Sequence, residues 1–260
     1  MFDPLPDLSS ARILISNDDG IDAPGLKVLE RVAHALSNDV WVVAPETEQS
    51  AVAHSLTIRR PLRIRHLSER RFAVDGTPTD SVLLGIRHVL KDKRPDLVLS
   101  GINRGGNLGD DVTYSGTVAA AMEGTLLGVP SMAFSQAITN DHPVKWSTGE
   151  HWAGEIIRRA TAAGWPRNVL LNVNFPDVAH GRVTGIETAR QGKRKLGDEL
   201  SERIDPRGET YFWVGGQRTE DRGLPGTDLE AVCRGAVSVT PLCVDFTHAR
   251  AMAALERAFQ

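Results

Sequence analysis

Short apolar runs alternate with amphipathic stretches through the first half of the chain. Residues 12–16 (RILIS) and 40–44 (VWVVA) are rich in aliphatic and β-branched side chains, as is typical of strands covered on both faces. Between these runs, apolar residues recur at steps of three and four, as on the buried face of a helix: Leu26, Leu29, Val32, Ala33 and Leu36. The pattern predicts a strand, a helix and a second strand parallel to the first.

The same pattern returns twice. A helical stripe over 82–90 precedes the apolar run 96–100 (DLVLS), and a helical segment over 115–128 precedes the run 130–134 (PSMAF). We therefore predict an α/β fold of three layers (αβα), with a Rossmann-like, mostly parallel sheet, helices on both faces and a C-terminal β-hairpin excursion. Ligands of such sheets bind beyond the carboxyl ends of the strands, so a site is expected in the loops there.

The pattern changes in the last third of the chain. Residues 189–209 mix charge, glycine and proline with little apolar periodicity, which indicates a long excursion or flexible arm, and a solvated loop rather than a binding patch. Apolar runs at 210–216 and 235–246 predict strands, and 247–259 predicts a closing helix capped by Thr247. We divide the chain into three segments: a Rossmann-like catalytic core (1–180), a β-rich excursion with a hairpin arm (181–246) and a C-terminal helix that returns to the core (247–260).

Composition narrows the class of ligand. The net charge of -3, from 30 Lys+Arg and 33 Asp+Glu, gives no basic field for a nucleic-acid polymer or an anionic membrane, so a small ligand is expected. Cys233 and Cys243 are the only cysteines, too few for a disulfide framework. The first ten residues form neither a basic nor an apolar leader, and no apolar run approaches the ~20 residues that span a bilayer. We expect a cytoplasmic protein.

Asp18 and Asp19 stand side by side directly after the first apolar run. Their repulsion must be offset by a cation or by hydrogen-bond donors, and paired carboxylates on a loop suit a hard divalent ion. The alternative is that Asp19 or Asp22 caps the following helix. One aspartate is enough for a cap, so the pair favours a metal site.

A glycine-rich segment at residues 100–124 follows another predicted strand. Its glycines allow a ligand to approach the backbone, and the amides of Asn103 and Asn107 suit a metal ion or a phosphate. The segment then enters a helix whose free N–H groups form an anion site, at Ser115, Gly116 and Thr117. A glycine-rich turn with a serine cap is the alternative; the position after a strand favours phosphate.

Several common nucleotide and hydrolase motifs are missing from the sequence. It contains no G-x-x-x-x-G-K-[ST], G-x-G-x-x-G, G-x-S-x-G or H-E-x-x-H. A phosphatase that forms an aspartyl-phosphate needs an aspartate where this chain has Asn17, and an amide cannot serve as that nucleophile. If the protein is a phosphatase, the nucleophile is therefore expected to be water activated by a metal.

Four segments in this order resemble the SurE family: 17–26 (NDDGIDAPGL), 42–57 (VVAPETEQSAVAHSLT), 74–82 (VDGTPTDSV) and 100–124. The resemblance is close over about 12–135, and the C-terminal run SVTPLCVDFT is also similar. SurE proteins are stationary-phase survival proteins with metal-dependent 5'/3'-nucleotidase activity. Four ordered motifs are far more specific than one.

The resemblance implies one divalent metal ion per subunit, Mg²⁺ or Mn²⁺, on four oxygen ligands: Asp18, Asp19, Ser50 and Asn103. Two carboxylates, a hydroxyl and an amide carbonyl suit such a hard ion. Considered alone, Ser50 is a loop or cap serine and His54 a packing residue; the resemblance gives His54 a weaker role in phosphate or proton handling.

The implied reaction is hydrolysis of nucleoside 5'- and 3'-monophosphates, and of short-chain polyphosphate, by metal-activated water. Asp18 or Asp19 orients the water, Asn103 completes the catalytic set, and neutral groups hold the phosphate: Asn107, Ser115, Gly116 and Thr117. No residue is assigned as general acid. A nucleotide- or phosphate-sensing protein without turnover is the alternative; an oxidoreductase would need a glycine fingerprint that the first loop lacks.

The sequence departs from the usual family pattern at Glu46, Glu48 and Ser81, and we expect none of these to touch a proposed ligand. The resemblance also implies a homodimer, or a dimer of dimers, through exchange of C-terminal hairpins. Phe212 and Trp213 in the arm either meet a partner subunit or pack on their own sheet.

Overall fold

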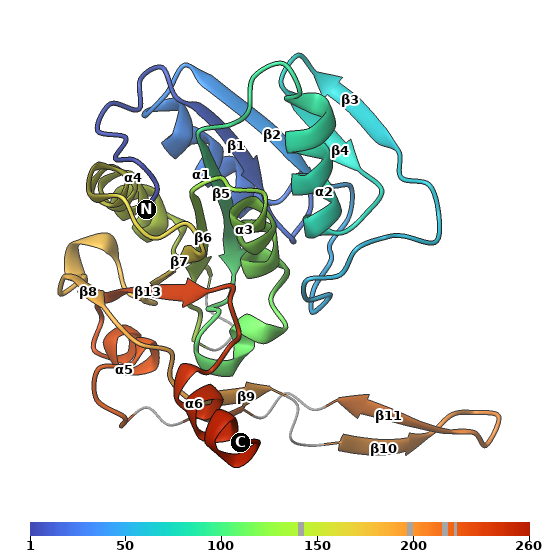
Figure 1. Cartoon of the computed structure of the whole chain (residues 1–260). Coiled ribbons are helices and arrows are strands. Elements are labelled where there is room, and N and C mark those ends of the chain that lie inside the picture. Colours follow the sequence, from blue (N-terminus) through green and yellow to red (C-terminus); the bar gives the residue numbers. More distant parts are fainter. Residues whose placement is uncertain (140–142, 197–199, 215–217, 221–222) are drawn as a thin grey trace.

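A nine-stranded sheet forms the centre of the computed structural model (Figure 1), which describes every residue except 140–142, 197–199, 215–217 and 221–222. Its strand order is β3-β4-β2-β1-β5-β6-β7-β13-β8, and most neighbours are parallel; β3 runs antiparallel to β4, and β13 to β7. The strand bounds are β1 Arg12–Ser16, β2 Asp39–Pro45, β3 Ile64–Ser68, β4 Arg71–Val74, β5 Leu97–Arg104, β6 Ser131–Gln136, β7 Val169–Phe175, β8 Ile186–Thr188 and β13 Val237–Cys243.

Helices cover both faces of the sheet, so the predicted three-layer α/β fold is confirmed (Figure 1). Their bounds are α1 Pro24–His34, α2 Pro78–Leu84, α3 Gly116–Leu126, α4 Trp146–Ala163, α5 Asp228–Cys233 and α6 Ala249–Ala258, with shorter turns η1 Gly85–Val89, η2 Gly109–Thr113 and η3 His180–Arg182. Because side chains alternate along a strand, Ile13 and Ile15 pack toward α1 and α4, whereas Leu14 packs on the opposite side with α2.

Local sequence explains where the helices begin. Pro24 opens α1 in the first turn, where its missing N–H costs nothing. Thr77 caps α2 by accepting a hydrogen bond from the Asp80 N–H, while the Asp80 carboxylate accepts one from the Thr77 N–H. This capping box shows that the segment 74–82 serves the helix that follows it.

The charged stretch 189–209 contains strands as well as loop. Two antiparallel pairs leave the sheet: β9 (Arg194–Leu196) with β12 (Arg218–Glu220), and β10 (Leu200–Ile204) with β11 (Thr210–Val214). The β10–β11 ribbon extends away from the body of the molecule (Figure 1). We call this ribbon the arm. It confirms the predicted hairpin excursion.

The C-terminal third divides between sheet and surface. Strands β8 and β13 lie within 181–246 yet belong to the nine-stranded sheet, whereas no residue of α6 is buried. The division at 180 and 246 stays a prediction. The expectation that Thr247 caps the last helix is wrong: His248 is the cap, and its Nδ1 accepts the Ala251 N–H at 3.1 Å. Among the described helices, none is both long and apolar enough to span a bilayer.

Candidate active site

A cavity of about 580 Å³ opens where β1 and β5 end. It lies beyond the carboxyl ends of parallel strands, where α/β sheets bind their ligands. All four predicted metal ligands line it, as do two of the predicted phosphate-binding residues: Asp18, Asp19, Ser50, Asn103, Asn107 and Ser115. Residues from three separate loops therefore meet at one cavity.

The loop after β1 is fixed by backbone contacts. Asn17 is buried, and its Nδ2 donates to the Gly20 carbonyl at 2.8 Å. Gly20 has φ +96, and a Cβ atom there would lie 3.2 Å from the Thr47 carbonyl carbon, so glycine suits this turn. The Gln49 N–H donates to the Asp18 carbonyl at 2.7 Å and joins this loop to the one that carries Ser50.

Asp18 is held at the start of α3. The hydroxyl of Thr117 donates to Oδ1 of Asp18, and a Cβ atom on Gly116 would lie 2.7 Å from the Asp18 Cβ. The side chain is only 6% exposed. Burial, and to a smaller extent the neighbouring Asp19, raises the pKa of Asp18 to about 7, while the Thr117 hydrogen bond lowers it. A positive charge beside this carboxylate would stabilise its ionised form.

Gly116 and Thr117 therefore contact Asp18 and do not line the cavity. The N-terminus of α3 was expected to receive an anion, and the anion that it receives in the structure is the Asp18 carboxylate. Direct contact of Gly116 and Thr117 with phosphate stays a prediction.

Asp19 is more open than its neighbour. Its Oδ2 accepts the Arg104 N–H at 3.1 Å. Burial raises the pKa of the Asp19 carboxyl, the Arg104 hydrogen bond lowers it, and the charge of Glu48 raises it further. Two adjacent carboxylates thus share a partly buried wall with a third, which favours the binding of a cation between them.

Ser50 and Asn103 add neutral oxygens to this wall. Asn103 Nδ2 donates to the Gly105 carbonyl at 2.8 Å, which leaves its Oδ1 available as a ligand. The Ser50 hydroxyl donates to Glu48 Oε1 at 2.7 Å. The expectation that Glu48 touches no proposed ligand is therefore wrong. Its carboxylate contacts the side chain of Ser50, two residues further along the chain, and Glu48 lines the cavity.

The chemistry of these donors fits a hard divalent cation. The set offers two carboxylates, one amide oxygen and one hydroxyl, all oxygen ligands of the type that Mg²⁺ and Mn²⁺ take. Within the residues that the structure describes, no group of three or more His, Cys, Asp and Glu side chains is close enough to hold a metal. A site dominated by histidine and cysteine, as zinc prefers, is thus missing from that part of the chain.

Of the four residues predicted to bind phosphate, two line the cavity and two do not. Asn107 and Ser115 line the cavity, but the Asn107 Nδ2 donates to Ser135 Oγ at 2.8 Å, and the Ser115 Oγ accepts the Val118 N–H at 3.0 Å as the cap of α3. The Ser115 hydroxyl hydrogen is still free to serve as a donor. Both residues are therefore positioned by the protein before any ligand binds.

His54 lies outside the residues that line the cavity. Its Nε2 is 2.9 Å from Oε2 of Glu123, a buried carboxylate on α3. This contact attaches the loop of Ser50 to the helix that holds Asp18. The packing interpretation of His54 accounts for what the structure shows.

Sequence reasoning missed several residues that line the cavity: Glu48, Arg104, Asp111, Tyr114, Val144 and Trp146. The glycine-rich segment 100–124 contains three of them, Arg104, Asp111 and Tyr114. Their place in a loop after a predicted strand was a signal that could have found them. Trp146 begins α4, about 40 residues further along the chain, and no local signal connects it to the other loops.

Comparison with known proteins supports these observations. The family model described as "Survival protein SurE" matches residues 13–198. The chain belongs to the SurE family. It is 72% identical over 258 residues to the 5'-nucleotidase SurE of Paramagnetospirillum magneticum, covering 99% of each chain, and 59% identical to the 5'-nucleotidase SurE of Rhodospirillum rubrum, with full coverage of both.

A solved structure shares the whole SurE fold. The crystal structure of the SurE protein from Aquifex aeolicus superposes with a TM-score of 0.84 at 40% identity, covering 96% of this chain and all of that one. The predicted family is thus confirmed by sequence and by structure, over the core and the C-terminal region alike.

Proposed function

We propose that this SurE protein is a metal-dependent 5'-nucleotidase that hydrolyses nucleoside monophosphates to nucleoside and phosphate. One observation carries the proposal: the adjacent carboxylates of Asp18 and Asp19 line one cavity together with the glycine-rich loop of Asn107. The relatives named 5'-nucleotidase SurE, at 72% and 59% identity, support the same reaction.

Asp18, Asp19, Ser50 and Asn103 would hold one Mg²⁺ or Mn²⁺ ion. When bound, such an ion supplies positive charge to the phosphoryl group and makes a water molecule more acidic. Thr117 keeps Asp18 in place by donating to Oδ1. Asp19, whose Oδ2 is held by the Arg104 N–H, is the carboxylate that orients the attacking water, because it is the less buried of the two.

Asn107 and Ser115, which line the same cavity as the aspartates, bind the phosphate oxygens with neutral donors. The Gly105 N–H already donates to the Gln136 carbonyl at 3.0 Å. The backbone N–H of Gly106, which also lines the cavity, suits an anion, because glycine lets it approach closely. Preorganised donors of this kind stabilise the charge that develops as the phosphate ester breaks. The exposed Arg104 adds a positive charge at the rim.

The nucleoside is bound by the aromatic part of the cavity. Tyr114 and Trp146 line it together with Val144. Flat aromatic side chains stack on any nucleobase, so the cavity accepts several bases. We expect 3'-monophosphates and short polyphosphates as further substrates, since the phosphate contacts use no group that recognises a particular leaving oxygen.

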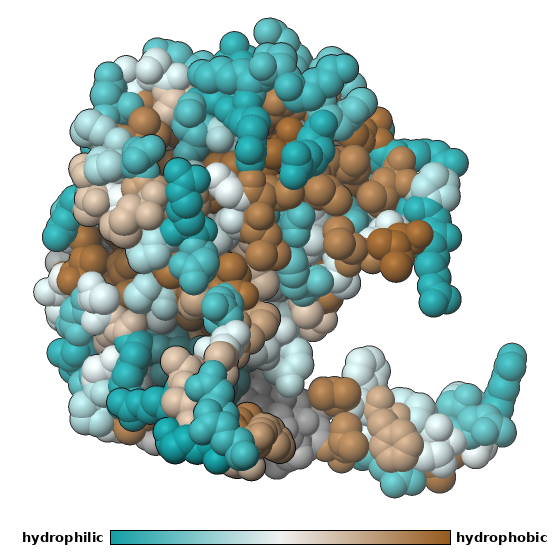
Figure 2. Space-filling view, in the orientation of Figure 1, coloured by the Kyte–Doolittle hydropathy of each residue, from teal (hydrophilic) through white to brown (hydrophobic). Residues whose placement is uncertain are grey.

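We also propose that the protein is a homodimer or a dimer of dimers, joined through the arm. Figure 2 shows hydrophobic surface along the arm, away from the body. Its apolar side chains are exposed in the single chain: Leu200, Ile204, Tyr211, Phe212, Trp213 and Val214. None of them belongs to a buried core cluster of the described residues, and a two-stranded ribbon of this kind is marginal in water. A second copy would cover them.

Phosphate release from a panel of nucleoside monophosphates tests the nucleotidase proposal. The native protein is measured with Mn²⁺, Mg²⁺ or EDTA beside Asp19→Asn. We expect release with either metal, none with EDTA, and a loss of at least roughly a hundredfold in the variant, the size that follows removal of a key electrostatic group. Metal and nucleotide binding without release from any substrate would instead identify a sensor.

A further inference from the structure

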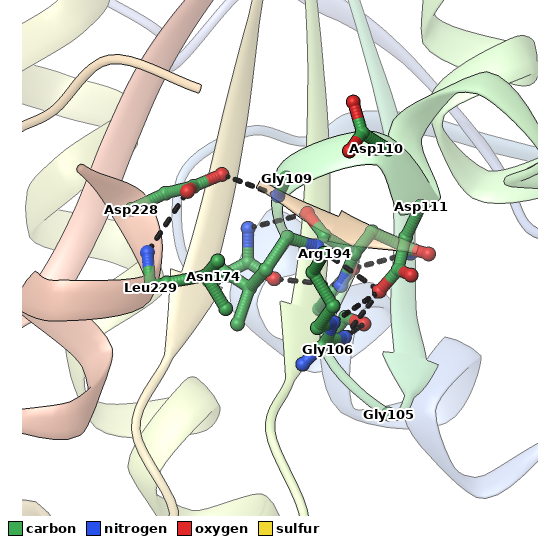
Figure 3. Close-up of polar contacts among 12 residues, drawn as sticks. Gly105, Gly106, Gly109, Asp110, Asp111, Asn174, Arg194, Asp228 and Leu229 are labelled. Carbon is green, nitrogen blue, oxygen red and sulfur yellow. Dashed lines mark hydrogen bonds and ion pairs between the residues drawn. The ribbon is translucent and has the colours of Figure 1, made fainter. Parts of the chain in front are cut away.

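The glycine-rich loop of the cavity is held from behind by residues that follow it by more than 80 positions. Figure 3 shows these contacts around Arg194, the first residue of β9. The Arg194 and Asp111 side chains are 7% and 9% exposed. Arg194 Nε lies 2.9 Å from Asp111 Oδ2, Nη2 contacts the same oxygen, and Nη2 also donates to the Gly106 carbonyl at 2.8 Å.

A second carboxylate supports the same loop. Asp228, fully buried at the start of α5, accepts the Gly109 N–H at 2.9 Å and the Gly192 N–H at 2.8 Å. Gln191 Nε2 donates to the Gly109 carbonyl at 3.0 Å. Gly109 has φ +56, and a Cβ atom there would lie 2.8 Å from the Arg194 nitrogen, so the two segments lie in direct contact.

We propose that Arg194 is a positioning residue for the reaction: through Asp111 and the Gly106 carbonyl, it fixes the loop that binds phosphate. Asp111, Gly106 and Asn107 line the cavity, whereas Arg194 is not among the residues that do so. The guanidinium also neutralises a carboxylate in the wall that receives an anion. Its planar fork suits this place, because two of its nitrogens contact the Asp111 carboxylate while Nη2 also bonds the Gly106 carbonyl; an ammonium group has a single nitrogen for both and no fixed fork.

Arg194 is close to the arm in the sequence. Arg194 begins β9, and the arm strand β10 starts six positions later at Leu200. The role of Arg194 in catalysis rests on the proposed function. Its effect on the loop can be tested by phosphate binding alone, without turnover.

The test compares the full-length native protein with Arg194→Lys, Arg194→Met and a control, Arg159→Met. Arg159 forms an exposed i,i+4 ion pair with Glu155 on α4 and takes no part in the site. Each protein is assayed for melting temperature, Mn²⁺ binding, binding of inorganic phosphate to the Mn²⁺-loaded protein, and kcat and KM with a nucleoside monophosphate.

We expect Arg194→Lys to keep the native melting temperature and to bind Mn²⁺ within about twofold of the native affinity, while its affinity for phosphate falls roughly tenfold. In Arg194→Met the affinity for phosphate should fall further, at least about thirtyfold. Amide exchange at Asn107 and Gly109 should accelerate in both variants and stay native in Arg159→Met. Phosphate affinity and exchange at native values in a folded Arg194→Lys would overturn the inference, because a purely structural arginine would alter only the melting temperature.

These outcomes separate the inference from the nucleotidase proposal. If the native protein binds phosphate but releases none from nucleotides, the proposed function fails, while a tenfold weaker phosphate affinity in Arg194→Lys still supports the role of Arg194. If the native protein turns over nucleotides and both Arg194 variants keep native kcat, KM and phosphate affinity, the inference fails and the function stands.

Discussion

The loop that carries Asp18 and Asp19 and the arm both extend beyond the central sheet, and they differ in how they are supported. Asp18 is 6% exposed and accepts a hydrogen bond from Thr117 of α3, and the glycine-rich loop beside it is held by Arg194 and Asp228. The arm is a two-stranded sheet in which β10 pairs with β11. It exposes 58% of Phe212 and 66% of Trp213. The first region is stabilised from within the chain. The second leaves large apolar side chains exposed in the single chain.

This difference predicts opposite responses to mutation. Changes near the aspartates should alter chemistry and leave assembly intact, because their contacts lie within one subunit. If the arm joins subunits as proposed, changes in it should alter assembly first, because its apolar side chains are exposed in the single chain.

The largest effect is expected for Asp18→Asn. It removes a carboxylate from the proposed metal site, so kcat should fall by about a hundredfold to a thousandfold. Isothermal titration with Mn²⁺ and steady-state phosphate release measure the two parts of the loss. Sedimentation should show an unchanged oligomer; dissociation of the variant would contradict the separation of the two regions.

The same variant gives a prediction on pH. Burial raises the folded-state pKa of Asp18 to about 7 in the metal-free protein, above its value in an unfolded chain of about 3.9. The protonated carboxyl is thus favoured by folding, and this contribution is present at pH below about 4 and is lost as the pH rises toward 7. In EDTA, Asp18→Asn should therefore gain stability relative to the native protein between pH 4 and pH 8, by up to a few kcal/mol.

Denaturation in urea at both pH values measures this gain. Saturating Mn²⁺ should reverse it, because a bound cation stabilises the ionised carboxylate of the native protein. A stability difference that is constant with pH would show that Asp18 titrates normally in the folded protein.

The arm is tested by the double variant Phe212→Ser/Trp213→Ser. Large aromatic side chains dominate interfaces, so the dissociation constant of the oligomer should rise at least roughly tenfold, with little change in the melting of the monomeric core. Light scattering over a dilution series measures it. Leu67→Ser, which alters a 38%-exposed residue of β3, is the control and should leave the oligomer unchanged.

A smaller effect is expected for Trp146→Ala. Loss of base stacking costs about 1–3 kcal/mol, so KM for nucleoside monophosphates should rise about tenfold, whereas KM for glycerol phosphate, which has no base, should change little. Equal increases for both substrates would place Trp146 in the support of the cavity instead of in base binding.

The smallest effect is expected for Glu48→Gln. The charge of Glu48 raises the pKa of Asp19, so its removal should move the acid limb of the pH profile of kcat/KM to lower pH. The rate at neutral pH should change by less than about tenfold, as for a partly exposed charge. An acid limb that moves to higher pH would contradict this assignment.

The sequence by itself determined the elements of the core and one wall of the site. Alternating apolar runs and helical stripes place Ile13, Leu14 and Leu26 as the structure does, because strand and helix periods leave a local pattern. The sequence could also predict four residues of the site for a similar reason. Asp18 and Asp19 follow β1, Asn103 lies at the end of β5 and Asn107 follows it, and parallel strands bring their carboxyl ends to one edge.

Only the tertiary structure decided the remaining contacts. Trp146 enters the cavity from α4, Arg194 supports the loop from β9, and Thr117 points to Asp18 and not to the cavity. None of these follows from spacing, because each depends on the packing of segments far apart in the chain. The exposure of Phe212 and Trp213 is likewise a tertiary fact: the sequence showed an apolar strand, and only the fold shows that both side chains stay exposed among the described residues.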